Sequence, residues 1–270
     1  MTCTSIHPTA VLAAGVELGE RVAIGPFCTV DADVCIGDDT RLISHVAISG
    51  LTHIGCRNRF FPFCSIGHEP QDLKYHGEAS KIVIGNDNTI RENVTINTGT
   101  EGGGMLTRIG DGNLLMAYVH IAHDCLLGDR IVLANCATLA GHVLIDDDAI
   151  IGGMSAIHQF LRIGRMSMVG GMSGIVKDIP PYSLTAGGYR PGLAGLNLVG
   201  LKRHGLSREQ IRKLKNIYRL LLQTVGDIQQ RLQEARACAE SDEHALHLID
   251  FVATAKRGTT LHRRDNPSRD

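Results

Sequence analysis

Residues 109–174 read, in groups of six, IGDGNL, LMAYVH, IAHDCL, LGDRIV, LANCAT, LAGHVL, IDDDAI, IGGMSA, IHQFLR, IGRMSM and VGGMSG. Each group opens with an aliphatic residue, and its fifth position is often small, as at Cys125, Ala137 and Ala149. A period of six fits neither an amphipathic α-helix nor the alternation of an ordinary hairpin strand. It is the hexapeptide signature of a parallel β-helix, in which the aliphatic residue is buried and the small residue leaves room for a corner.

The repeat extends back almost to the first residue in the same register. Its earlier anchors are Ile6, Leu12, Leu18, Ile24, Val30, Ile36, Leu42, Ile48, Ile54, Phe60 and Ile66. Two longer segments then interrupt it, HEPQDLKYHGEASK between Ile66 and Ile84, and TGTEGGGMLTR between Ile96 and Ile109. A solenoid accommodates such excursions only at its corners, and long ones usually carry function.

The first excursion brings together Asp72, Lys74 and Tyr75, a polar group that suits a hydroxylated or phosphorylated ligand. A solvated loop without a ligand is an equally good interpretation of this spacing. In the second excursion, the glycines at 102–104 are followed by neither GKS nor GKT and by no helix pattern, so they match a phosphate-binding loop only weakly. We expect the second excursion to be a flexible loop.

Three histidines follow successive members of one aliphatic column, the column of Ile121, Leu139 and Ile157. They are His123, His142 and His158. Successive coils lie about 4.8 Å apart and each residue of offset adds roughly 3.3 Å, so we expect the three rings to reach one ligand. The alternative is that surface histidines coincide here by chance among the 13 in the chain.

Composition limits the class of protein. The 270 residues are enough for one large repeat domain and a smaller one, and 27 basic against 28 acidic residues argue against a surface built as a whole for nucleic acid. The N-terminus lacks a signal-peptide pattern and no apolar run could cross a bilayer, so we expect a cytoplasmic protein. None of the eight cysteines forms a CxxC pair, and Cys28, Cys64 and Cys125 occupy small core positions that suit reduced thiols.

A helical segment follows the solenoid. The repeat stops at DIPP, residues 178–181, because two prolines cannot continue a strand ladder. After the linker AGGYRPGLAG, residues 207–210 have the form of a capping box, and an apolar stripe continues from Ile211 to Val225. Weaker helical patterns cover residues 228–239 and 242–255. We expect a β-helix at 1–186, a small α-helical domain at 187–257 and a disordered polar tail at 258–270.

Basic charge is concentrated at the start of this helical segment. From Arg190 to Arg219 the chain carries eight basic side chains against one acidic residue, Glu209. A solvated helix face normally mixes both signs, so the imbalance favours an anionic partner.

Several motifs occur in a fixed order around the solenoid: IGHEPQDLKY at 66–75, HIAHDC at 120–125, LAGHV at 139–143, IIGGMSAIHQF at 150–160 and VGLKRHG at 199–205. Together they resemble the UDP-N-acetylglucosamine acyltransferases, which begin lipid A synthesis, over residues 1–257. The resemblance implies a left-handed parallel β-helix with a small α-helical C-terminal domain. It also implies a homotrimer with active sites between subunits, acyl carrier protein as donor and UDP-N-acetylglucosamine as acceptor. It implies no cofactor, no metal, no nucleic-acid partner and no stable membrane insertion.

The resemblance also implies roles for individual residues. His123 matches the general base that takes the proton of the sugar 3-hydroxyl, Asp124 would orient its imidazole, and the Gly141 N–H would stabilise the oxyanion. Gly171 matches the position that limits acyl length, where glycine favours a longer chain. The positions that match substrate contacts are Asp72, Lys74, His142, His158, Gln159, Asn197 and Arg203.

Two residues depart from the family pattern. Val199 stands where an acidic residue near the uracil is usual, and His204 stands where a second arginine is common. Both bear on the nucleotide contacts and neither bears on the acyl transfer itself.

Two other classes of function fit a hexapeptide solenoid. One is a metal-dependent hydratase of the γ-carbonic anhydrase type, with His120, His123 and His142 as zinc ligands. The QDLKY excursion and the basic helical segment have no role in such an enzyme. The other is a non-catalytic scaffold that binds a carrier protein.

Overall fold

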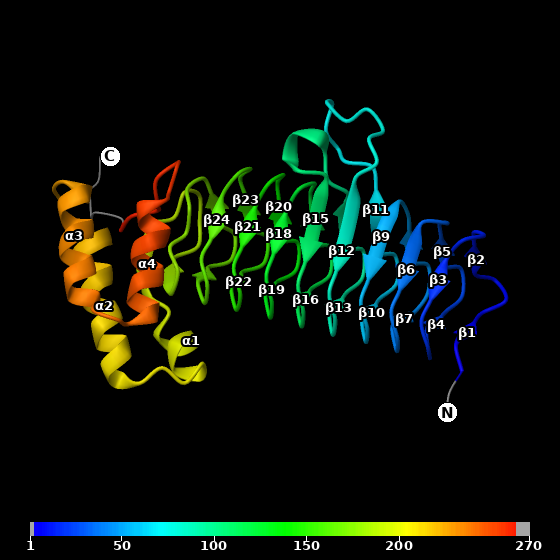
Figure 1. The fold of residues 1–270 in the computed structure, drawn as a ribbon, viewed down its shortest axis with the longest axis horizontal. Helices are drawn as coiled ribbons and strands as arrows, with labels where there is room; N and C mark the ends of the chain where they lie inside the picture. Colours follow the sequence, from blue (N-terminus) through cyan, green and yellow to red (C-terminus); the bar gives the residue numbers. More distant parts are fainter. Residues whose placement is uncertain (1–2, 263–270) are drawn as a thin grey trace.

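A computed structural model describes residues 3–262. The chain coils into a three-sided, left-handed parallel β-helix that ends in a group of helices (Figure 1). Each coil places one short strand in each of three sheets, and strand partners in neighbouring regular coils are 18 residues apart, as are Ile121 and Leu139. The predicted fold class is confirmed.

The strands fall into three sheets, which we call the first, second and third sheets; all their pairings are parallel except the antiparallel pair β27–β28 at the end of the first sheet. The first contains β1 (Ser5–Ile6), β4 (Ala23–Ile24), β7 (Arg41–Leu42), β10 (Arg59–Phe60), β13 (Thr89–Ile90), β16 (Leu114–Leu115), β19 (Val132–Leu133), β22 (Ile150–Ile151), β25 (Met168–Val169), β27 (Ser183–Thr185) and β28 (Leu193–Leu196). The second contains β2 (Val11–Leu12), β5 (Thr29–Val30), β8 (Ala47–Ile48), β11 (Ser65–His68), β14 (Thr95–Asn97), β17 (His120–Ile121), β20 (Thr138–Leu139), β23 (Ala156–Ile157) and β26 (Gly174–Ile175). The third contains β3 (Glu17–Leu18), β6 (Val34–Ile36), β9 (Leu51–Ile54), β12 (Lys81–Ile84), β15 (Leu106–Ile109), β18 (Leu126–Leu127), β21 (Leu144–Ile145) and β24 (Arg162–Ile163).

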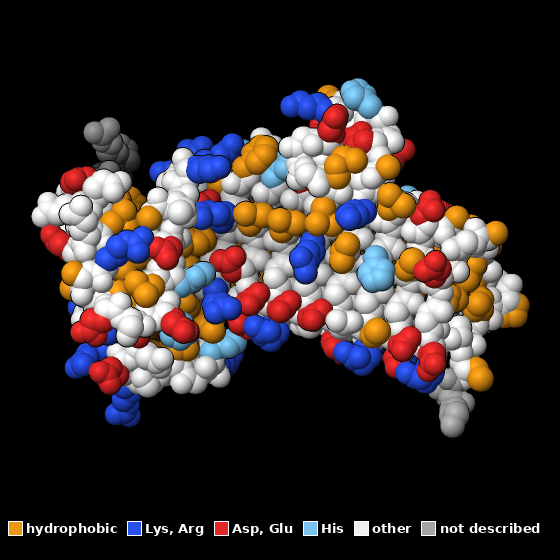
Figure 2. Space-filling model, viewed as in Figure 1, with side chains coloured by type: hydrophobic (Ala, Val, Ile, Leu, Met, Phe, Trp, Pro, Cys, Tyr) orange, Lys and Arg blue, Asp and Glu red, His pale blue; other side chains and the backbone are white. Residues whose placement is uncertain are grey.

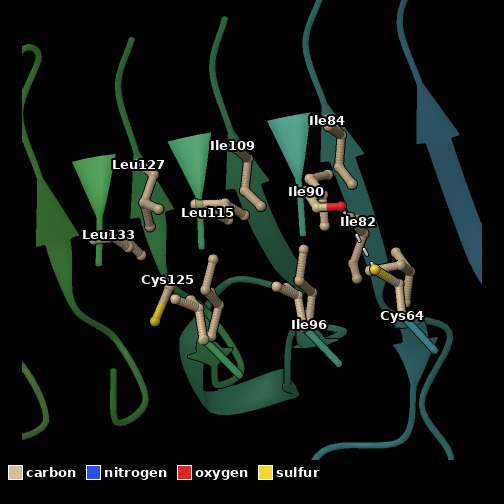
Figure 3. Packing of buried hydrophobic residues seen from close by; sticks show 14 of the residues in the cluster. Cys64, Ile82, Ile84, Ile90, Ile96, Ile109, Leu115, Cys125, Leu127 and Leu133 are labelled. Atoms are coloured by element: carbon tan, nitrogen blue, oxygen red, sulfur yellow. Dashed lines mark hydrogen bonds between the residues drawn. The ribbon is translucent and has the colours of Figure 1, made fainter. Parts of the chain in front are cut away.

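The aliphatic anchors of the hexapeptides form the core of the prism. Figure 3 shows Ile84, Ile109 and Leu127 from the third sheet stacked along the axis, with Ile96 and Cys125 on the opposite side of the core. Each of these side chains is at most 4% exposed. Burying one such aliphatic side chain stabilises the fold by about 1.5–3 kcal/mol, so the periodic column is the main source of stability.

The corners of the prism are formed by residues with left-handed backbone geometry. At the corner between the third and first sheets, Arg21 and Asp39 both have a positive φ and form an ion pair at 2.8 Å. Arg57 with Asp87 and Arg130 with Asp148 repeat this pair further along the same corner. Figure 2 shows the resulting rows of acidic and basic side chains along one edge of the third sheet.

The helices cover the C-terminal end of the prism (Figure 1). They are α1 (Leu198–Arg203), α2 (Arg208–Leu222), α3 (Ile228–Ala239) and α4 (Glu243–Ala253). The predicted capping box is confirmed, because Ser207 Oγ accepts from Gln210 N and Gln210 Oε1 accepts from Ser207 N. Helix α1 was not expected from the sequence, and β28 lies within the segment expected to be helical. No helix among residues 3–262 has the length and apolar character needed to span a bilayer.

The last described residues pack against the end of the solenoid. Thr260 N donates to Asp178 O at 2.8 Å, and His262 Nε2 lies 2.9 Å from Tyr218 Oη. Thr259 and Thr260 are buried. Residues 258–262 therefore differ from the disordered tail expected from residue 258, because their backbone pairs with the last coil. Residues 263–270 of that expected tail lie outside the described residues.

Candidate active site

Both excursions leave the prism at the corner between the second and third sheets. They lie side by side and project together from the solenoid (Figure 1). Asn97 Nδ2 at the base of the second loop donates to the carbonyls of His68 (3.3 Å) and Glu69 (3.0 Å) in the first. Glu101 N donates to Glu78 Oε1 at 3.1 Å. These bonds hold the two loops in one arrangement beside the coil that carries His123.

Asp124 is the buried centre of this corner. Its side chain is 0% exposed, and its carboxylate accepts hydrogen bonds from Thr100 N (2.9 Å), Thr100 Oγ1 (2.6 Å) and His123 Nδ1 (2.8 Å). Its own backbone N–H donates to Thr107 Oγ1 at 2.8 Å. Because a buried carboxylate needs such donors, these bonds fix both the Asp124 side chain and the second loop.

The second loop is not the flexible segment that we expected. Residues Glu101–Gly103 form a 3₁₀ turn, and Gly103 lies directly against the Asp124 carboxyl. A Cβ atom at Gly103 would overlap that carboxyl group, so the close approach requires glycine. The glycines therefore allow the loop to close over Asp124.

His123 is oriented by this carboxylate. An ionised carboxylate only accepts hydrogen bonds, so Nδ1 of His123 is the donor to Asp124 and Nε2 is left as the acceptor. Asp72 Oδ2, from the first loop, lies 3.9 Å from Nε2. The structure thus brings Asp72 to His123 and Asp124, although Asp72 is far from them in the sequence. An imidazole held in this way can act as a general base.

Gly141 lies directly under the imidazole of His123. A Cβ atom at Gly141 would come within 2.5 Å of His123 Cε1, so a side chain there would displace the ring. Gly141 O accepts from Phe160 N at 3.1 Å, whereas its N–H has no hydrogen-bond acceptor within the described chain. A free backbone N–H beside the base can bind a developing oxyanion.

His142 continues the same corner toward the C-terminus. Its ring packs edge-on to His123 with centroids 5.0 Å apart, and stacks on Phe160 at 4.3 Å. Burial lowers the pKa of His142 below its ordinary value, which favours the neutral ring near pH 7. The Arg257 guanidinium lies over the Phe160 ring, 5.3 Å from its centroid.

His158 does not join the other two histidines. It directly follows the anchor Ile157, so it lies on the outer surface of the second sheet and not at the corner. Its Nδ1 is 3.3 Å from Gln159 O, and its side chain lines a hollow of about 570 Å³ with Tyr189, Arg190 and Arg257. Of the three histidine rings that we expected to converge, only those of His123 and His142 lie together.

The remaining predicted site residues are spread over the chain. Lys74 is exposed on the first loop, and its backbone N–H donates to Asp72 Oδ1. The backbone carbonyl of Gln159 accepts a hydrogen bond from the Arg257 guanidinium at 3.2 Å. Asn197 is buried at the start of α1, where it accepts from Gly200 N and donates to Met166 O.

Arg203 and Gly171 lie away from His123 within one chain. Arg203 is exposed on α1, on the opposite side of the molecule from the loops in Figure 1, and the departing residues Val199 and His204 are exposed beside it. Gly171 lies at the corner between the first and second sheets, across the second sheet from His123.

Three ligand-type residues could hold a metal at the corner. Among the described residues, His123, Asp124 and His142 place one ligand atom each within 4.8 Å of the others. His120, the third histidine of a possible zinc site, is not in this group, and its Nδ1 lies 2.7 Å from Thr95 Oγ1. Asp124 already accepts from Thr100 and His123. The three histidines of a zinc hydratase therefore do not assemble in one chain.

Sequence reasoning missed Thr100, Gly103, Phe160 and Arg257. Phe160 could have been found, because it lies 18 residues after His142 in the same hexapeptide position. Thr100 could not have been found, because its position depends on the path of the second loop. Arg257 could not have been found either, because its position depends on how α4 packs against the solenoid.

Comparisons with known proteins agree with this arrangement. The family model described as UDP-N-acetylglucosamine O-acyltransferase, domain 2, matches residues 178–260, and the model of the bacterial transferase hexapeptide matches residues 106–141. A curated acyl-(acyl-carrier-protein)–UDP-N-acetylglucosamine O-acyltransferase from Thermodesulfovibrio yellowstonii is 47% identical over 253 residues, which cover 94% of this chain and 98% of that protein.

Solved structures give the same result. The UDP-N-acetylglucosamine O-acyltransferase from Moraxella catarrhalis superposes with a TM-score of 0.92 at 43% identity and covers 94% of this chain and 99% of its own. The acyltransferase from Francisella novicida has a TM-score of 0.92 at 37% identity, with 97% and 95% covered. The chain therefore belongs to the UDP-N-acetylglucosamine O-acyltransferase family and is an acyltransferase.

Proposed function

We propose that the protein transfers a 3-hydroxyacyl chain from acyl carrier protein to the 3-hydroxyl of UDP-N-acetylglucosamine, the first step of lipid A synthesis. His123 Nε2 takes the proton of the sugar hydroxyl while its oxygen forms a bond to the thioester carbonyl carbon. The tetrahedral intermediate then breaks its carbon–sulfur bond, and the imidazolium returns the proton to the departing thiolate. The products are an ester and a free carrier-protein thiol.

The hydrogen bond between His123 Nδ1 and Asp124 carries this proposal. It fixes the ring with Nε2 facing Asp72 on the first loop, and it favours the imidazolium that forms during the reaction. The neutral His142 beside it does not repel that positive charge. We infer that the Gly141 N–H, which has no hydrogen-bond acceptor within residues 3–262, stabilises the oxyanion.

The substrate contacts follow from the first loop and from the second sheet. Asp72 is close enough to His123 to bind a hydroxyl of the same sugar that reacts. Lys74, His158 and Gln159 are proposed as further contacts to the nucleotide sugar and the donor, and His158 faces a basic hollow that suits an anionic substrate. Asn197 would contribute to substrate binding indirectly, because it caps α1 and so positions Arg203 on that helix.

A homotrimer with shared sites is part of the proposal. In one chain His123 and Gly171 lie at different corners, and Arg203 lies on α1, so a second copy is needed to bring such groups to one substrate. The corner that carries Gly171 also exposes an apolar ridge suited to burial between copies: Phe27, Phe63, Tyr118, Met154 and Met172. All eight cysteines are free thiols, which suits the expected cytoplasmic location.

The assay that tests the proposal uses defined substrates. The purified protein is incubated with UDP-N-acetylglucosamine and a series of 3-hydroxyacyl carrier proteins, and the acylated nucleotide sugar is measured by mass spectrometry. We expect a single ester product and a free carrier thiol in equal amounts. The 3-amino analogue of the sugar is compared in parallel. A faster reaction of that analogue would show that the acceptor is an amine, and the absence of any product would leave the scaffold interpretation.

The basic segment from Arg190 to Arg219 is proposed to bind the acidic carrier protein. Lys213 is paired with Glu240 at 2.7 Å, and the other basic side chains of the segment are exposed without an ion pair among the described residues. Raising the salt from about 0.05 M to about 0.5 M is expected to weaken binding of the carrier-protein donor by about tenfold or more. Binding of a neutral acyl analogue should hardly change.

A matched pair of variants tests the same point. Lys215→Glu on α2 should weaken carrier-protein binding, whereas Arg41→Glu on β7, at the other end of the prism, should leave it unchanged. Equal salt dependence for both donors, or equal effects of the two substitutions, would contradict a docking role for this segment.

A further inference from the structure

Thr100 on the second loop holds both oxygens of the Asp124 carboxylate. Its backbone N–H donates to Asp124 Oδ1 at 2.9 Å, and its hydroxyl donates to Asp124 Oδ2 at 2.6 Å. Oδ2 is also the oxygen that accepts the proton of His123 Nδ1, at 2.8 Å. The Thr100 hydroxyl and the imidazole of His123 therefore share one acceptor.

The 3₁₀ turn at Glu101–Gly103 does not use the Thr100 hydroxyl. Thr100 occupies the N-cap position of this turn, where a threonine side chain normally accepts a hydrogen bond from a backbone N–H. Within the described chain the Thr100 side chain makes no such bond. The turn is closed by the Thr100 carbonyl, which accepts from Gly103 N and Met105 N, both at 3.0 Å. The hydroxyl is therefore directed to Asp124 and not to the turn.

The Asp124 carboxylate needs such an external hold. The last torsion of an aspartate side chain has only a broad intrinsic preference, so neighbours decide where its oxygens lie. Two imidazole nitrogens are near Oδ2, His123 Nδ1 at 2.8 Å and His142 Nδ1 at 3.8 Å. A carboxylate that turned from His123 to His142 would remove the acceptor that keeps the His123 proton on Nδ1.

The position of Thr100 is itself fixed by the two loops. The next residue, Glu101, donates its backbone N–H to Glu78 Oε1 on the first loop at 3.1 Å. Gly103 lies so close to the Asp124 carboxyl that a Cβ atom there would overlap it. The Thr100 hydroxyl is thus held against a carboxylate that is itself fully buried.

We propose that Thr100 is a positioning residue of the acyl transfer. Its hydroxyl and N–H hold the Asp124 carboxylate toward His123 and away from His142, so that the imidazole keeps its proton on Nδ1 and offers Nε2 to the sugar hydroxyl. Thr100 itself touches no reacting atom. This inference rests on the proposed acyl transfer, because it assigns the bond a role in that reaction.

The first test compares two substitutions at this position. Thr100→Val keeps the shape of the side chain and removes the hydroxyl. We expect kcat to fall by about ten- to a hundredfold, the loss typical of one hydrogen bond to a charged group. KM for UDP-N-acetylglucosamine should stay within about twofold of the wild-type value, because the sugar contacts of the first loop are unchanged. Thr100→Ser keeps the hydroxyl and should retain most of the wild-type kcat.

The ring nitrogens of His123 give a second readout, which needs no substrate. Nitrogen NMR of protein labelled at histidine distinguishes a protonated from an unprotonated ring nitrogen, and the His123→Ala variant identifies the His123 signals. In alkaline buffer the wild-type protein should show a protonated Nδ1 and an unprotonated Nε2. Thr100→Val should show a mixture of the two tautomers, and Thr100→Ser should match the wild type.

Thr40→Val is the matched control for loss of a buried threonine hydroxyl. Thr40 is fully buried near the N-terminal end of the prism, where its hydroxyl donates to Gly55 O at 3.0 Å and accepts from Asn58 N at 3.2 Å. Thr40→Val should lower the melting temperature and leave both kcat and the His123 signals unchanged.

Three results would overturn the positioning role. They are wild-type kcat and ring signals in Thr100→Val, a higher KM with unchanged kcat and ring signals, and a Thr100→Ser variant that behaves like Thr100→Val. If the wild-type protein formed no acylated product, the proposed acyl transfer would fail, whereas the NMR signals would still decide whether Thr100 orients His123.

Discussion

Replacing His123 by alanine is expected to lower kcat by about 10² to 10⁴, because a positioned general base contributes a factor of this size. The fold should survive, since His123 lies at a corner and the stability of the prism comes from the aliphatic column. The measurement is kcat and KM for the acyl transfer, together with the melting temperature and the oligomeric state of the variant.

A control separates loss of the base from general damage. His53 is an exposed histidine on β9 of the third sheet, with no hydrogen bond or ion pair among the described residues. His53→Ala should keep full activity. If His123→Ala turned over at nearly the wild-type rate, the assignment of the base would be wrong. If both variants lost activity and melted early, the effect would be structural.

Gly171→Met is expected to invert the preference for donor chain length. We propose that glycine leaves the corner between the first and second sheets open for a donor of about 12 to 14 carbons. Each methylene excluded from an apolar groove loses roughly 0.8 kcal/mol, so excluding about four should change the selectivity by about a hundredfold or more. The measurement is kcat/KM for 10-carbon and 14-carbon donors with the wild-type protein and the variant.

The backbone at Gly171 allows this substitution to be interpreted. A Cβ atom there would lie 3.3 Å from Gly153 O, which is close but needs only a small adjustment, and Gly171 has no left-handed φ. At Gly170, by contrast, a Cβ atom would come within 2.8 Å of Gly187 N. Gly171→Ala should give a smaller shift in the same direction. A uniform loss for both donors, with a lower melting temperature, would mean that Gly171 only serves a tight corner.

The fold was predictable because the hexapeptide period is a local property of the sequence. Ile121 and Leu139 pair as strand neighbours, as their spacing requires. The capping box at Ser207 was also readable, since it involves only residues within one helical turn. Helix α1 was not readable, because it is six residues long and its cap, Asn197, is held by Met166 on the last coils. The packing of residues 258–262 likewise depends on contacts with Asp178 that no local pattern reveals.

The candidate site was predictable only where it follows the repeat. His123 and His142 were placed together correctly, since both lie in adjacent coils at the same corner. His158 was placed with them wrongly, because one residue of offset moves a side chain from a corner to a sheet surface. The closure of Thr100 and Gly103 over Asp124 follows from the path of an irregular loop, and the sequence has no period there.

The strict spacing of the coils also restricts how such a protein can change length over generations. In the regular coils strand partners are 18 residues apart, and Gly141 lies under His123 only because this count is kept. Deleting one residue between Asp124 and Gly141 would turn every later anchor toward solvent, whereas duplicating a whole coil before Ser65 would lengthen the molecule and leave the catalytic corner intact. Changes of other sizes are tolerated only where the chain already leaves the prism. The two loops beside His123 are such places, so inheritable variation in substrate recognition can accumulate there while the rest of the solenoid grows or shrinks by entire coils.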